Sequence, residues 1–76
     1  MVGILVFDYS KLRGRIVEKY GSNYEFAAAL GLKSSLLSAR LNQTTPFKMA
    51  EIKRAQELLD IDPAEIGQYF FTLKVR

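Results

Sequence analysis

One window of this 76-residue chain gathers polar and basic side chains that suit binding to nucleic acid rather than catalysis. Residues 33–48 hold three basic residues, Lys33, Arg40 and Lys48, and no acidic one. The same window carries the amides and hydroxyls of residues 42–45. Phosphates repel carboxylates and accept hydrogen bonds from cations, amides and hydroxyls. The window therefore predicts a phosphate-facing surface.

The rest of the composition argues against an enzyme. The chain contains no cysteine and no histidine, which removes disulfides, thiolate chemistry and the usual zinc ligands. No remaining group acts as a general base near neutral pH unless its pKa is strongly perturbed. Several carboxylates, such as those of Glu25 and Glu65, stand where helices are expected to begin. We expect no enzymatic activity, no metal, no cofactor and no small-molecule substrate.

Charge and hydropathy restrict the location of the protein. The net charge is +3, a mild excess, and 49% of the residues are hydrophobic, enough for a compact core. The longest apolar run, Val2–Phe7, is far shorter than the about 20 residues that cross a bilayer, and it lacks the features of a secretory signal. We expect no membrane association, and a soluble, intracellular protein.

The elements that position the polar window are mostly helices. A short strand is predicted over Val2–Phe7 and another over Phe71–Arg76, and these strands can pair. A first helix follows Asp8 or Ser10 and ends at Gly21, and a second starts at Ser22 and ends at Leu30. The third runs from about residue 33 or 34 to 41, the fourth from 46–48 onward, and the fifth follows Asp62-Pro63. The prediction is one mainly α domain over residues 1–76.

The second and third helices meet the requirements of a helix-turn-helix unit over residues 22–42. Two short helices that cross steeply need a small residue at the crossing, which Ala27 supplies. The turn needs a residue that tolerates positive φ, which Gly31 supplies, and Leu37 fills the gap beneath the third helix. The three residues stand in register.

This pattern resembles the Cro/repressor-type helix-turn-helix regulators of phages, in the lambda-repressor-like DNA-binding domain family. The segment from Leu37 to Asn42 and the later Glu51-Ile52 are similar to that family, over about residues 9–70. Arg40 departs from it where many members carry an apolar residue, and Gln43 departs where many carry glycine.

The resemblance implies a five-helix lambda-repressor-like fold that binds double-stranded DNA with the third helix in the major groove. It also implies a cytoplasmic protein of a bacterial host, associated with the nucleoid. The implied base-reading residues are Lys33, Ser34, Ser35, Ser38 and Ala39. The candidates for phosphate contacts are Asn23, Tyr24, Arg40, Asn42, Gln43, Thr44 and Lys48. Alternatives remain open: Ser34 or Ser35 can cap the third helix, Arg40 can pair with a neighbouring acid, and the others can be solvated loop residues.

Apolar residues crowd the C-terminus, and they raise the possibility of a protein interface at Tyr69, Phe71, Leu73 and Val75. We hypothesise a two-fold homodimer, with an intramolecular ribbon that closes a monomer as the alternative. The main functional hypothesis is a Cro-like repressor that reads an operator. The alternative is a small phage antirepressor or co-repressor that binds the DNA-binding domain of another repressor. An antitoxin is less favoured, because that role usually needs an additional toxin-covering segment.

Overall fold

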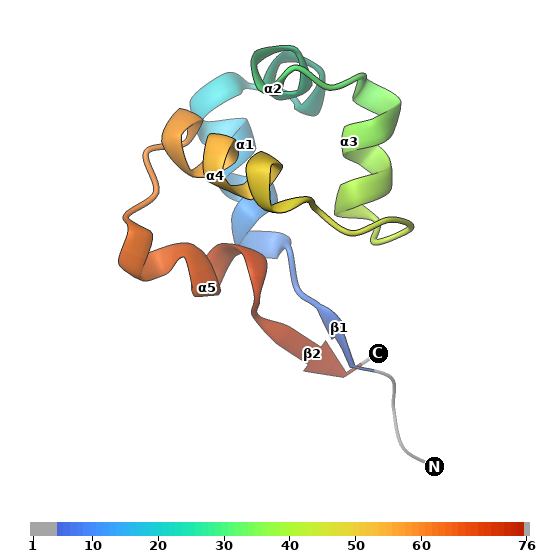
Figure 1. Cartoon of the computed structure of the whole chain (residues 1–76), viewed down its shortest axis with the longest axis vertical. Coiled ribbons are helices and arrows are strands. Elements are labelled where there is room, and N and C mark those ends of the chain that lie inside the picture. The colour runs from blue at the N-terminus through green and yellow to red at the C-terminus, as the bar shows by residue number, and fades with distance from the viewer. Residues whose placement is uncertain (1–4, 76) are drawn as a thin grey trace.

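The computed structural model describes residues 5–75, and these form five helices with a short ribbon of two strands (Figure 1). The helices are α1 (Ser10–Tyr20), α2 (Asn23–Leu30), α3 (Ser34–Leu41), α4 (Met49–Leu58) and α5 (Ile66–Phe70). A 3₁₀ turn, Pro63–Glu65, leads directly into α5, and β1 (Leu5–Phe7) pairs with β2 (Leu73–Val75). The prediction of a mainly α fold with five helices and two pairing terminal strands is confirmed.

The ribbon pairs the first and last described segments of the chain, and it extends away from the helices (Figure 1). Its strands are antiparallel, with Leu5 opposite Val75, Val6 opposite Lys74 and Phe7 opposite Leu73. Within the described residues β2 starts later than predicted; Val2 to Ile4 and Arg76, which the predicted strands included, lie outside the described residues. On the C-terminal side, Phe71 is the cap of α5 because its N–H donates to Gly67 O, so β2 begins only at Leu73.

Several helices begin or end at the capping residues that the sequence predicted. Gly21 and Gly31 both have φ of +83°, a left-handed conformation that costs glycine little. Ser22 Oγ accepts a hydrogen bond from the Glu25 N–H at 3.2 Å and satisfies one free amide at the start of α2. The helix starting at Asp62-Pro63 begins as expected, with the Asp62 carboxylate accepting from the Ala64 N–H.

α4 begins at Met49, slightly later than predicted, because Phe47 is used by the core. Phe47 packs edge-on against both Tyr9 and Phe70, with ring centroids 5.5 and 5.4 Å apart. The backbone stays extended through Lys48, whose N–H donates to the Glu51 carboxylate at 2.9 Å. The largest fully buried side chains of this core are Phe26, Phe70, Leu12, Ile16, Leu37 and Leu59.

Candidate functional site

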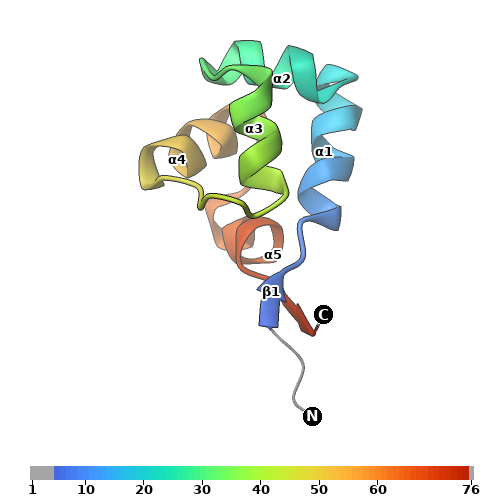
Figure 2. The same cartoon turned by 90° about the vertical axis from the view of Figure 1, so that its right-hand side faces the viewer.

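The α2–α3 unit presents the predicted DNA-reading face. Ala27 and Leu37 are buried at the crossing, and the Leu32 N–H donates to Ala27 O to close the turn. Figure 2 shows α3 at the surface with α2 across one end of it. Three of the predicted base-reading side chains that start α3, on Lys33, Ser34 and Ser35, are exposed, as is Ser38, whereas Ala39 is half-buried. No side chain caps α3, so neither serine has the capping role that the sequence left open.

Arg40 lies beneath this face rather than on it. Only 5% of the residue is exposed, and its guanidinium forms a two-point ion pair with Glu51. Nε lies 2.8 Å from Glu51 Oε1 and Nη2 lies 3.1 Å from Oε2, while Nη1 donates to the Thr45 hydroxyl. The pair holds the pKa of Glu51 below its ordinary value and raises that of Arg40. Of the two roles considered for Arg40, the structure has the pairing with an acid, and this pair joins α3 to α4.

Two amides that were candidates for phosphate contacts are also engaged within the protein. Asn42 accepts a hydrogen bond from Arg13 Nη2 at 3.0 Å and donates to the Ser38 hydroxyl at 3.3 Å. Gln43 Oε1 accepts from the Phe7 N–H at 2.9 Å, and Nε2 donates to Phe7 O at 2.7 Å. The Gln43 carboxamide therefore occupies the outer edge of β1 as a neighbouring strand would.

Gln43 stands in an unusual backbone conformation for this role. Its φ is +62°, in the left-handed region that favours glycine and disfavours a side chain by about 1 kcal/mol or more. The two hydrogen bonds to Phe7 give a physical reason for a glutamine at this position. The other candidates for phosphate contacts, Asn23, Tyr24, Thr44 and Lys48, are exposed.

The opposite end of the molecule exposes apolar side chains. Phe71, Leu73 and Val75 are 49%, 56% and 68% exposed, respectively. Tyr69 differs from these three: it is half-buried against the core, and the Lys11 ammonium lies 4.7 Å from its ring centroid. β1 and β2 pair within one chain, as in the ribbon alternative of the sequence interpretation, and a homodimer at this end stays a prediction.

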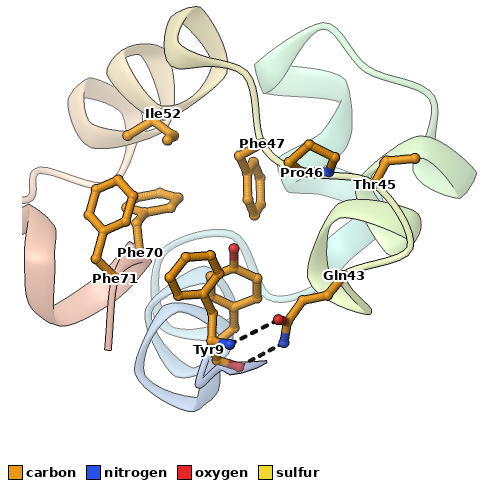
Figure 3. A pocket seen from close by; sticks show the side chains of 9 residues that line it. Tyr9, Gln43, Thr45, Pro46, Phe47, Ile52, Phe70 and Phe71 are labelled. Carbon is orange, nitrogen blue, oxygen red and sulfur yellow. Dashed lines mark hydrogen bonds between the residues drawn. The ribbon is translucent and has the colours of Figure 1, made fainter. Parts of the chain in front are cut away.

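An aromatic pocket of about 310 Å³ adjoins the base of the ribbon (Figure 3). Its walls come from β1, the loop before α4, α4 itself and the end of α5. It is lined by Phe7, Tyr9, Gln43, Thr45, Pro46, Phe47, Ile52, Phe70 and Phe71. Sequence reasoning missed this pocket, because its residues are distant in the chain. The one local signal was Pro46, which favours an extended backbone at the residue before it and stands next to the aromatic Phe47.

Metal binding and membrane insertion find no support in residues 5–75. Within that range no group of three or more histidine, cysteine, aspartate or glutamate residues is placed to hold a metal ion. No helix there has the length and apolar character needed to span a membrane.

The chain belongs to a family of proteins of unknown function, DUF739, whose model matches residues 5–73. It is also similar to a protein of solved structure, the modulator of repression (MOR) of the temperate bacteriophage TP901-1 from Lactococcus lactis. The two are 43% identical over 86% of this chain and 88% of the other, with a TM-score of 0.77. No curated protein matches the chain significantly.

These findings correct the family assignment made from the sequence. The matched family is DUF739 and the similar structure is a modulator of repression, so placing the chain in the Cro/repressor family was wrong. The spacing of Ala27, Gly31 and Leu37 describes how two helices cross around a tight turn. Proteins of different families can share that packing requirement, because it arises from steric fit rather than from a common ligand.

Proposed function

We propose that this protein is a small, non-enzymatic phage regulator that binds the DNA-binding domain of another repressor, as an antirepressor or co-repressor. The observation that carries the proposal is the 43% identity with a phage modulator of repression over most of both chains. The TM-score of 0.77 shows that the two proteins share a fold, and the identity shows that they also share much of their sequence.

The internal bonds of the α2–α3 face support a protein partner over an operator. Arg40, Asn42 and Gln43 all bond to groups of this chain. Turning Arg40 outward to a phosphate would leave the Glu51 carboxylate partly buried without its cation, which is strongly unfavourable. The cations that remain in the window are Lys33 and Lys48, whereas tight operator binding commonly neutralises about 6–10 phosphates.

The test compares three mixtures by fluorescence anisotropy of labelled DNA from the flanks of the gene. The first contains this protein, the second contains the repressor encoded by the same phage genome, and the third contains both. We expect weak, sequence-independent binding by this protein alone, and a repressor–DNA affinity that changes at least tenfold when it is added. Calorimetry of this protein with the repressor's isolated DNA-binding domain should give a defined stoichiometry.

The same experiment can also contradict the proposal. Tight binding by this protein alone, lost on a scrambled DNA sequence and steep in salt, would identify an operator-binding regulator instead. The Lys33→Ala variant is the matched probe for that outcome, since Lys33 is the exposed cation at the start of α3.

A further inference from the structure

The ribbon has two outer edges, and residues 5–75 close one of them and leave the other open. The Asp8 N–H donates to Thr72 O at 2.7 Å, which makes these two residues a hydrogen-bonded pair. Since such pairs alternate along antiparallel strands, the main-chain groups of Phe7 and Leu73 point away from each other. Gln43 bonds both groups of Phe7 and so closes the edge of β1.

The edge of β2 is open. By the same alternation, the N–H and C=O groups of Leu73 and Val75 point away from β1. No hydrogen bond reaches them from residues 5–75, and Figure 1 shows no helix or strand beyond β2 on that side. An unpaired strand edge is a template for pairing with another chain.

The side chains of the ribbon add an apolar face to this open edge. The register places Phe7, Leu73 and Val75 on one face and Lys74 on the other. Leu73 and Val75 are more than half exposed. At its base this apolar face continues into the aromatic pocket, because Phe7 belongs to both and packs edge-on against Phe71 with centroids 6.0 Å apart.

Charge favours a segment of another protein over a second copy of this chain. A polar hollow beside the ribbon is lined by Arg13 and Lys74 together with Phe7, Gln43 and Val75, so an acidic residue suits its two cations. A second copy carries the same +3 charge and the same Lys74.

We infer that β2 binds an extended segment of the partner repressor as a third strand of the ribbon. The segment alternates apolar side chains, which cover Leu73 and Val75 and fill the pocket, with an acidic side chain opposite Lys74. This inference rests on the proposed function and names the surface that performs it.

The first test is amide hydrogen exchange of this protein with and without the repressor's DNA-binding domain. The N–H groups of Leu73 and Val75 should exchange at least tenfold more slowly in the complex. Lys74 is the internal control, because the register pairs its N–H with Val6 in the free protein and its exchange should change little. Unchanged exchange at Leu73 and Val75 in a formed complex would overturn the inference.

Two variants separate the open edge from the apolar face. Leu73→Pro removes the outward N–H without removing a bond between β1 and β2, and Leu73→Ser removes only the apolar side chain. Both should weaken repressor binding at least tenfold in calorimetry. Val17→Ser is the matched control, an exposed apolar residue on α1, and its affinity should stay within twofold of the native protein.

The outcomes distinguish the two proposals. If the native protein binds the repressor and both Leu73 variants bind equally well, strand addition is wrong while the proposed function stands. If the native protein binds no repressor, both proposals fail. If sedimentation shows a dimer that the Leu73 variants abolish, the occupant of β2 is a second copy, and the inference is overturned.

Discussion

The two ends of this molecule use their side chains in opposite ways. On the α2–α3 face, side chains suited to outside contacts are bonded inside the protein: Arg40 to Glu51, and Gln43 to Phe7. At the ribbon, side chains suited to a core are left outside, with Leu73 and Val75 more than half exposed. A helix-turn-helix shape by itself is therefore a weak guide to which side chains of this protein are free to bind a partner.

The largest expected effect tests how firmly the α2–α3 end is built. Leu37→Ala removes a fully buried side chain at the helix crossing and should lower the free energy of unfolding by about 2–5 kcal/mol. Leu73→Ala, at the exposed ribbon, should cost about 0.5 kcal/mol or less. Urea unfolding of both variants measures the difference. Equal losses would mean that the ribbon is as integral to the core as the helix crossing.

The ion pair between Arg40 and Glu51 beneath α3 should make the stability of the protein depend on pH. Because Arg40 holds the pKa of Glu51 below the ordinary value of 4.5, the pair stabilises the folded state above that pH. The contribution is lost as the pH falls through the lowered pKa. Glu51→Gln should destabilise the protein at neutral pH and should flatten this acid-induced loss. The measurement is thermal unfolding from pH 7 to pH 3.

Glu57→Gln, an exposed change on the same helix, is the control for that series. An acid-induced loss of the same size in native protein and in Glu51→Gln would show that the pair contributes nothing to the pH dependence.

A smaller loss of stability is expected at Gln43, which follows α3 and bonds to Phe7 of the ribbon. Gln43→Ala removes both hydrogen bonds to Phe7 and should cost about 1–2 kcal/mol, with faster amide exchange at Phe7. Thr44→Ala, at the exposed neighbour, should change stability by less than about 0.5 kcal/mol. Gln43→Gly loses the same bonds but relieves the positive φ, so it should be more stable than Gln43→Ala. If the Phe7 amide exchanged as slowly in Gln43→Gly as in the native protein, the Gln43 side chain would not have the strand-like role.

The smallest effect concerns DNA. If the α2–α3 face does not read an operator, Lys33→Ala should weaken DNA binding about as little as Lys53→Ala, an exposed lysine on α4. Each should reduce the salt slope by about 1 or less, and neither should change the preference between sequences. Titrations at several salt concentrations measure this. A sequence-dependent loss confined to Lys33→Ala would restore the face as a reading surface and would weaken the contrast between the two ends.

Local rules in the sequence determined most of the fold. Gly21 and Gly31 mark helix ends by their conformational freedom, and Ser22 and Asp62 mark helix starts by the amides they bond. These signals depend on neighbours within a few residues, so they can be read without knowing the tertiary structure. The alternation of residues 71–76 predicted a strand for the same reason, and Leu73–Val75 of that segment form β2.

Only the tertiary structure decided which polar groups are free. Arg40 and Glu51 are 11 residues apart, and Gln43 and Phe7 are 36 apart, so nothing local tells an inward-facing cation or amide from an outward-facing one. The aromatic pocket likewise joins residues from Phe7 to Phe71. The sequence determined that two short helices cross at Ala27, because a tight turn demands it. Which surface remains available to a partner depends on long-range contacts, because these engage Arg40 and Gln43 at one end and leave the edge of β2 open at the other.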